Sequence, residues 1–355
     1  MSRRVAKAVE GESTRRSFLK HIGEATAAGA AAAAIGNVGL AAAAGERRPG
    51  RVGRHTLGTT GLLGSEVGFG GHSWNYARVA DGKGGLRRTT LEEATRMISL
   101  GLEMGVNVFD SCTPLEEHSM PGEVIKRLNK RDEIIVCARL CHKMKGVAGD
   151  RETIYRWVDE RLKLWQTDRF DVLLLTNEVN DTPQSGYWDM SYSLEAVAKL
   201  KQQGKIRYAG FGCHFTPDWF REAFDRFGRE FDVCSMPYNF RHRGAEELIP
   251  LARKLGLGIV TIKAFARGEL LQGHDLEGAE AGLARDMLAF VLDNKLVDCC
   301  ICGVHTEAHV RENFSASWAG FSPDARRRLE QLATRGPCRA IAWLENGWLG
   351  VNRPS

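Results

Sequence analysis

Eight short apolar runs, separated by longer stretches that contain most of the charged residues, constrain the fold of this chain more than any other feature. Such near-continuous runs are typical of strands buried on both faces, as in parallel sheets covered by helices. The runs occupy residues 67–69, 106–109, 133–138, 172–175, 208–212, 233–236, 258–262 and 299–302.

The segments between these runs favour helices, because their apolar residues recur with helical spacing. The clearest cover residues 91–104, 150–165, 193–203, 218–227, 244–255 and 282–294. Eight strand and helix units predict an α/β fold, a single (β/α)₈ TIM barrel, and 355 residues can hold one. An open doubly wound sheet would need a G-x-G-x-x-G turn after an early strand, and Gly68-Phe69-Gly70-Gly71 is too short a match.

Composition and charge indicate a soluble globular enzyme without a nucleic-acid partner. Hydrophobic residues make up 43% of the chain and charged residues 26%. The net charge of +5 comes mainly from residues 1–48, which contain eight Lys/Arg and four Asp/Glu. The body of the chain is therefore close to neutral, and the clustered basic face that nucleic acids require is not expected.

The N-terminus carries the most specific short motif. Thr14-Arg15-Arg16-Ser17-Phe18-Leu19-Lys20 has the twin-arginine form, and an Ala- and Gly-rich stretch follows at residues 22–44. We expect residues 1–48 to be a signal peptide and linker recognised by the twin-arginine translocation machinery. A membrane anchor is the alternative, although Ala and Gly partition weakly into lipid. The mature protein would be periplasmic or otherwise extracytoplasmic, without a stable membrane span.

The nine cysteines do not indicate a disulfide framework, because their number is odd and a chain of this size does not need covalent cross-links. Six of them lie within or beside apolar runs, which predicts buried thiols that pack as small hydrophobic groups. These are Cys137, Cys213, Cys234, Cys299, Cys300 and Cys302.

Several segments, taken in order, resemble the aldo/keto reductase family. Residues 55–61 and 65–70 resemble its opening hairpin and first strand, and residues 106–110 resemble the strand that ends in Phe-Asp. Similar matches follow at residues 204–212, 236–239, 262–270 and 301–313. The resemblance implies a barrel over residues 52–316 with an N-terminal β-hairpin, and a C-terminal helical extension over residues 317–355.

The resemblance also implies a reaction: carbonyl and alcohol interconversion with a nicotinamide cofactor, in which a Tyr tuned by Lys, Asp and His delivers the proton. Asp110 occupies the family's Asp position, but Leu115 stands where the Tyr belongs and Arg139 replaces the Lys. The His position falls on Thr176 or Asn177. The family's catalytic set is thus only partly retained, with Asp110 and Arg139 as the expected polar centre.

The cofactor pocket departs from the family as well. Ser235 aligns with the Gln that holds the carboxamide, and Ile262 aligns with the aromatic residue that stacks on nicotinamide. Binding of NADP or NAD is still expected, through two loops and the start of a helix near residue 306. The residues expected to bind the cofactor are Lys263, Arg267, Gly268, Gly303, His305, Thr306, Glu312 and Asn313.

Histidines gather after the expected strands, independently of the family resemblance. They are His72, His118, His142, His214, His242 and His305, with Cys112, Cys141 and Cys213 beside them. His118 or His214 could act as the acid or base. Such residues could also bind zinc or another transition metal, but no H-E-x-x-H or C-x-x-C spacing is present, and polar residues collect in loops without meeting.

Three functional hypotheses follow from the sequence. The first is an exported oxidoreductase of the aldo/keto reductase type that acts on a small-molecule substrate. The second is a metal-dependent lyase, isomerase or hydrolase on the same barrel, and the third is a non-catalytic binding protein. Under the first, replacing Asp110 by Asn is expected to abolish turnover and to leave thermal stability nearly unchanged.

Overall fold

The computed structural model describes residues 48–74, 79–111, 119–141, 151–176, 191–212 and 217–334. Within them, eight parallel strands close into a barrel, in which each strand pairs with the next along the chain and the last, β12, pairs with the first, β3. The ring consists of β3 (Val67–Phe69), β6 (Val108–Ser111), β7 (Ile135–Cys141), β8 (Phe170–Thr176), β9 (Ile206–Gly212), β10 (Val233–Pro237), β11 (Gly258–Ile262) and β12 (Cys299–Cys302). The predicted (β/α)₈ barrel is confirmed.

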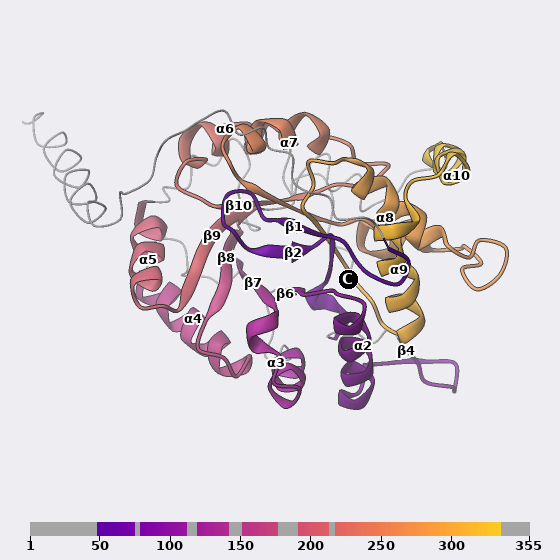
Figure 1. Cartoon of the computed structure of the whole chain (residues 1–355), viewed down its shortest axis with the longest axis horizontal. Coiled ribbons are helices and arrows are strands. Elements are labelled where there is room, and N and C mark those ends of the chain that lie inside the picture. The colour runs from indigo at the N-terminus through magenta and orange to yellow at the C-terminus, as the bar shows by residue number, and fades with distance from the viewer. Residues whose placement is uncertain are drawn as a thin grey trace, which may run out of the picture. The chain divides into compact units, whose positions relative to one another are not determined.

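Helices surround the strands, as Figure 1 shows. Those between the strands are α2 (Leu91–Glu103), α3 (Ser119–Arg127), α4 (Arg151–Leu164), α5 (Ser191–Gln202), α6 (Pro217–Phe227), α7 (Ala245–Lys254) and α8 (Leu283–Asp293). After β12 come α9 (Glu307–Ala319) and α10 (Pro323–Ala333). Local chemistry sets several boundaries: Thr90 and Glu93 form a capping box at α2, and Ser322 caps α10 just before a proline.

Two apolar layers hold the barrel together. Alternate strand residues such as Cys137, Leu174 and Val260 fill its interior, while neighbours such as Phe69, Phe109 and Phe211 pack outward against the helices. This alternation is the period of two expected of any strand, and it is invisible in the sequence because both faces are apolar.

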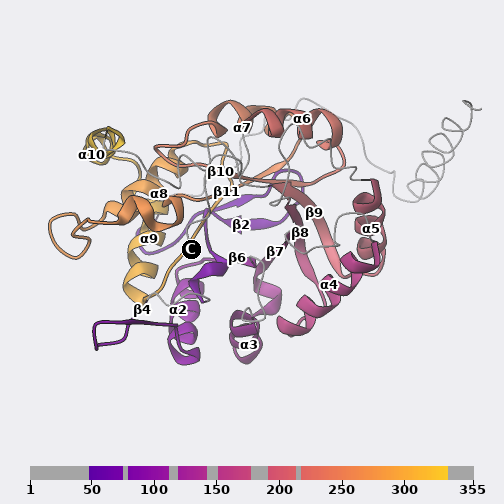
Figure 2. The same cartoon turned by 180° about the vertical axis from the view of Figure 1, so that it is seen from behind.

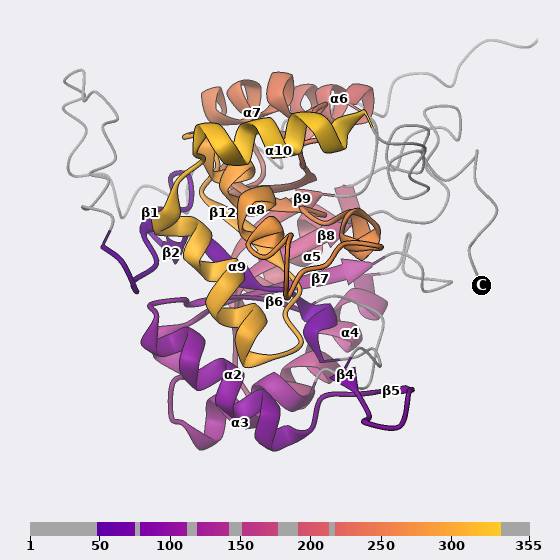
Figure 3. The ribbon, with the colours of Figure 1, turned by 90° about the vertical axis from the view of Figure 1, so that its right-hand side faces the viewer.

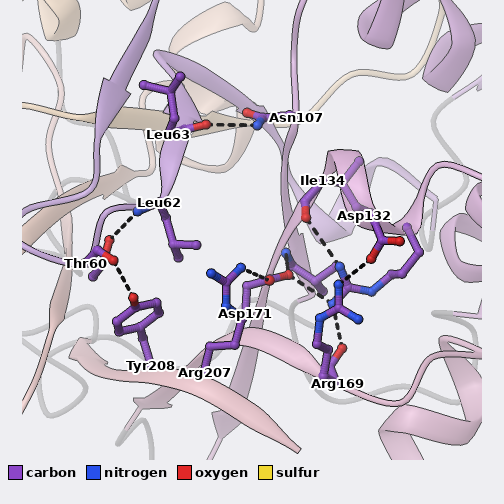
Figure 4. A network of polar contacts seen from close by, with 12 residues as sticks. Thr60, Leu62, Leu63, Asn107, Asp132, Ile134, Arg169, Asp171, Arg207 and Tyr208 are labelled. Atoms are coloured by element: carbon purple, nitrogen blue, oxygen red, sulfur yellow. Dashed lines mark hydrogen bonds and ion pairs between the residues drawn. The ribbon is translucent and has the colours of Figure 1, made fainter. Parts of the chain in front are cut away.

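The hairpin of β1 (Arg54–Thr56) and β2 (Leu63–Ser65) crosses the end of the barrel at which the strands begin. At its tip Gly58 has φ +53°, and a Cβ there would lie 2.2 Å from the Gly258 nitrogen, so only glycine fits. The Tyr208 hydroxyl also donates to the Thr60 carbonyl oxygen (Figure 4). The other end of the barrel, where the strands terminate, is here called the open end and carries the candidate site. Figure 2 shows the molecule from that side.

A network of charged residues centred on Asp171, which is 1% exposed, stabilises the end of the barrel at which the strands begin, here called the closed end (Figure 4). Its carboxylate accepts from the Val136 N–H at 3.0 Å, from Arg131 Nη2 at 3.0 Å and from Arg207 Nη1 at 3.2 Å. Polar residues at this end of a barrel serve stability, whereas catalysis occurs at the other end.

Four further elements lie outside the ring. The hairpin of β4 (Val79–Ala80) and β5 (Leu86–Arg87) projects beside α2 (Figure 3). The 3₁₀ turns η1 (Gly71–Ser73) and η4 (Ala266–Leu271) follow β3 and β11, and η3 (Arg131–Glu133) precedes β7. In the part of the chain that the structure describes, no helix combines the length and the apolar character that crossing a membrane requires.

Candidate functional site

Three side chains from separate strands meet inside the open end of the barrel. Asp110 near the end of β6 accepts a hydrogen bond from Arg139 Nε of β7 at 2.6 Å. Arg139 Nη2 donates to Ser235 Oγ of β10 at 2.9 Å. All three residues are buried, so the barrel walls fix this geometry. Asp110 and Arg139, the expected polar centre, therefore form an ion pair with each other, and the extension of this centre to Ser235 was not predicted.

Opposing influences act on the Asp110 carboxyl. Burial raises its pKa above that of an ordinary aspartate, and Arg139, the Gly71 N–H and the charge of Lys263 act against that shift. The carboxyl group is therefore buried beside the Arg139 guanidinium and lies within the electrostatic influence of Lys263. A pKa perturbed by burial and specific charged partners at the open end of a barrel is typical of a functional site.

The turn η1 links this centre to the loop after β12. Its first residue, Gly71, provides the backbone N–H that bonds to Asp110. Two residues later, Ser73 accepts from the Val304 N–H at 3.0 Å through its hydroxyl, and its carbonyl oxygen lies 3.4 Å from His305 Nδ1. Ser73 was missed by the sequence analysis, because a single serine in a turn carries no recognisable signal.

The loop after β11 has an unusual backbone. Lys263, Ala266 and Arg267 have φ of 65°, 44° and 63°, and Gly268 has φ of 91°. Each such non-glycine residue costs about 1–2 kcal/mol, and residues of this kind cluster at ligand-binding sites. Asn239 Nδ2 donates to the Lys263 carbonyl oxygen at 3.0 Å, which helps to hold the loop in place.

Packing on the far side also holds this loop. Buried Ala266 and Leu270 share an apolar cluster with Leu329 and Leu332 of α10. The C-terminal helix therefore supports the strained segment from outside the barrel.

The loop after β12 leads directly into α9 and leaves space for a ligand. Among the residues that the structure describes, a Cβ on Gly303 would meet only His305 Nε2, at 3.9 Å. The Thr306 hydroxyl caps α9 by accepting from the His309 N–H. The first turn of a helix leaves backbone N–H groups without intrahelical partners, and these groups favour phosphate.

Two residues of α9 that the sequence analysis expected to bind the cofactor differ in their hydrogen bonding. Asn313 Nδ2 donates to the Gly303 carbonyl oxygen at 3.2 Å, so it supports the loop from behind. Glu312, one helical turn from the start of α9, has a buried Oε1 with no hydrogen-bond partner among the described residues. A buried carboxylate oxygen in that state is suited to accept a hydrogen bond from a ligand.

These features fit a dinucleotide cofactor. The loops after β11 and β12, the seventh and eighth strands of the barrel, are the usual phosphate-binding loops of this architecture. They contain Lys263, Arg267, Gly268, Gly303, His305 and Thr306, whose role in binding the cofactor stays a prediction.

Other predicted residues lie elsewhere or outside the described part. His118, His142, His214, Cys112 and Cys213 belong to residues that the structure does not describe, as do Leu115 and Asn177. His242 is buried, its backbone N–H donates to Asn239 Oδ1 at 2.8 Å, and burial lowers the pKa of its ring to about 4. Within the described residues, no three His, Cys, Asp or Glu side chains are placed to hold a metal ion.

Two sequence interpretations need correction. The sequence also makes Trp74, Trp188 and Trp219 candidates for lining a substrate entrance. Trp74 and Trp219 are instead buried and pack on Phe69 and Phe211 respectively, and Trp188 lies outside the described residues. The expectation that Asp110→Asn leaves stability unchanged is also revised, because the partner of Asp110 is a buried guanidinium. The described cysteines Cys137, Cys234, Cys299, Cys300 and Cys302 are buried free thiols, as expected.

Comparison with known proteins identifies similar sequences and similar solved structures. L-galactose dehydrogenase of Arabidopsis thaliana is 24% identical over 322 residues, which cover 81% of this chain and 95% of that protein. The aldo-keto reductase AKR11C1 from Bacillus halodurans has the same fold in its holo form, with a TM-score of 0.61 and 23% identity over 80% of this chain and 97% of that one. Its apo form gives a TM-score of 0.59, with the same identity and coverage. The model of the aldo/keto reductase family matches residues 66–282, and the chain belongs to that family.

Proposed function

We propose that this chain is a nicotinamide-dependent oxidoreductase that interconverts a carbonyl group and an alcohol. The observation that carries the proposal is the buried Asp110–Arg139 pair, joined through η1 to a loop and helix start suited to a dinucleotide. When bound, the nicotinamide would supply or accept the hydride. The chain's own residues must bind the cofactor, orient the substrate and stabilise charge on oxygen.

The residues divide this work according to their positions. Gly303, Thr306 and the first N–H groups of α9 would hold the diphosphate, with Lys263 and Arg267 as nearby cations. Arg139 and Lys263 place positive charge beside Asp110, where developing negative charge on a substrate oxygen would be stabilised. His118 and His214 remain the proposed proton donors in place of the missing tyrosine.

The substrate we propose is a polyhydroxylated alcohol or the matching carbonyl compound. The name of the Arabidopsis relative, L-galactose dehydrogenase, supports this class. The buried polar centre of Asp110, Arg139 and Ser235 is chemically suited to a substrate rich in hydroxyl groups.

Fluorescence titration of the purified full-length chain with NADH and NADPH tests the proposal. Wild-type protein is expected to bind at least one of them with micromolar affinity, and absence of binding of both up to millimolar concentration would refute the proposal. Gly303→Val is expected to weaken binding at least tenfold while the urea midpoint is unchanged, because its side chain would enter the space beside His305. Ala319→Val at the opposite, exposed end of α9 is the matched control.

We also propose that the chain is exported by the twin-arginine route. The motif at residues 14–20 supports this, and it precedes the described residues. When residues 1–48 are fused to a reporter protein that must fold in the cytoplasm, we expect the folded reporter to be found outside the cytoplasm. The R15K/R16K double variant should abolish that export, and export that survives it would contradict the proposal.

A further inference from the structure

The helix α10 lies outside the closed ring and packs beside α8 (Figure 3). It follows β12 and α9 in the chain, so the ring of strands is complete before α10 begins. One narrow stripe of this helix is buried, and it consists of Ala325, Leu329 and Leu332. The remaining positions are exposed, apart from half-buried Arg328. The attachment of α10 can therefore be altered without changing a residue of the barrel itself.

The buried stripe of α10 belongs to an apolar cluster that also contains residues of α8 and of η4, the turn that follows β11. The members from these three elements are Leu329 and Leu332 of α10, Leu283 and Met287 of α8, and Ala266 and Leu270 of η4. Because side chains in such a cluster are close-packed, a loss of volume in α10 is transmitted to the rest of the cluster.

A buried carboxylate ties α10 to the beginning of α8. Asp286 is 4% exposed, and its Oδ1 accepts from Arg285 Nη2 at 3.0 Å. Its Oδ2 lies 3.1 Å from Arg328 Nη1 of α10. The same Arg328 nitrogen donates to the Ala281 carbonyl oxygen at 3.4 Å, at the end of the segment that leads from η4 to α8. Arg328 thus anchors α10 to both α8 and that segment.

The backbone around η4 combines strain with short-range hydrogen bonds. Ala266 and Arg267 have positive φ, as does Lys263 just before them. The Ala266 N–H donates to the Lys263 carbonyl oxygen at 2.9 Å, and the Gly268 N–H donates to that of Phe265 at 2.8 Å. Strained backbone of this kind persists only where the surrounding structure holds it in place.

From this arrangement we propose that α10 acts as a clamp on η4. When α10 is docked on the apolar cluster, η4 keeps its left-handed residues, and when α10 is loosened, η4 relaxes while the barrel stays folded. Packed side chains are a physical means of coupling two such elements. Lys263, Arg267 and Gly268 are expected to bind the cofactor, so the clamp regulates that site, a step that rests on the proposed function.

Hydrogen exchange of the full-length chain, followed by mass spectrometry, tests the clamp directly. In Leu329→Ala the amides of residues 263–272 are expected to exchange about tenfold faster than in the wild type, because the cluster loses packing and this segment opens locally. Leu200→Ala, the same change at a fully buried position of α5, is the matched control and should leave that exchange unchanged. Leu329→Met nearly conserves the volume and should restore the wild-type rate.

A charge variant tests the clamp without altering the apolar cluster. Arg328→Gln removes the ion pair with Asp286 and should speed the exchange of residues 263–272 about threefold. Arg327→Gln is its control, because Arg327 is exposed and pairs with Asp324 of the same helix.

The outcomes separate this inference from the proposed function. If residues 263–272 exchange no faster in Leu329→Ala and Arg328→Gln than in their controls, α10 does not clamp η4 and the inference is wrong. If exchange rises and the dissociation constant for NADH rises about threefold with it, the clamp and its regulation of the site are both supported. Faster exchange with unchanged NADH affinity refutes the regulation and leaves the clamp. If the wild type binds neither NADH nor NADPH, the proposed function fails, and the exchange rates still decide the clamp.

Discussion

Replacing Asp110 by Asn tests whether the buried ion pair is part of both the fold and the chemistry. The side chains of Asp110 and Arg139 are 6% and 5% exposed, and their contact measures 2.6 Å. The substitution removes the negative charge beside a buried guanidinium, whose Nη2 donates to Ser235 Oγ at 2.9 Å.

The expected loss of stability follows from that burial. Removing one partner of a buried ion pair costs about 3–5 kcal/mol, because the other charge loses its compensation. The Asn oxygen can still accept from Arg139 Nε and from the Gly71 N–H, so we expect about 2–3 kcal/mol, close to the value of a charged hydrogen bond.

Urea unfolding at pH 8 measures this loss, and it is combined with a measurement of turnover. We expect Asp110→Asn to lose activity and about 2–3 kcal/mol of unfolding free energy. The Asp110→Leu/Arg139→Met double variant should recover most of the stability and none of the activity, because it removes both buried charges. If each single variant lost less than about 0.5 kcal/mol of unfolding free energy, and the double variant lost the sum of the two, the reasoning would be refuted.

Three further predictions concern other parts of the barrel. The free energy of unfolding should decrease by about 3 kcal/mol as the pH is lowered from about 6.5 to about 4, because buried His242 has a pKa of about 4 and the unfolded chain binds the proton first. His242→Gln should flatten that part of the profile of unfolding free energy against pH, measured by urea unfolding. Asp171→Asn at the closed end should cost about 3 kcal/mol in urea unfolding without changing kcat/KM, whereas a large loss of kcat/KM would mean that this end contributes to catalysis. Titration with a thiol reagent should leave the buried cysteines of the described residues unmodified until urea unfolds the chain, because burial raises the pKa of their thiols and excludes the reagent. Rapid modification of these cysteines in the native protein would contradict their burial.

Much of the fold was predictable because its signals are local. Apolar runs such as 258–262 coincide with a strand, and the expected helix at residues 91–104 agrees with α2 (Leu91–Glu103) within one residue. Boundaries were less certain where strands extend into polar ends, as in β7, which continues through Arg139 to Cys141. A buried arginine does not look like strand interior in a sequence.

The site was only partly predictable for a related reason. Asp110 and Arg139 were identified because they stand at the positions of the family's Asp and Lys, and parallel strands bring the ends of β6 and β7 together. The participation of Ser73 depended on contacts across 231 residues of sequence, which no local pattern encodes. The burial of Trp74 and Trp219 was likewise decided by their neighbours.

The sequence alone determined the periodic alternation of strands and helices, and with it the barrel and the end at which its functional residues lie. Tertiary structure alone decided which charges are paired, which carboxylate oxygen is left without a described partner, and which residues adopt left-handed backbone conformations. The physical reason is that periodicity reflects each segment's burial, whereas pairing, desolvation and backbone strain depend on which distant segments the closed barrel brings within a few ångströms.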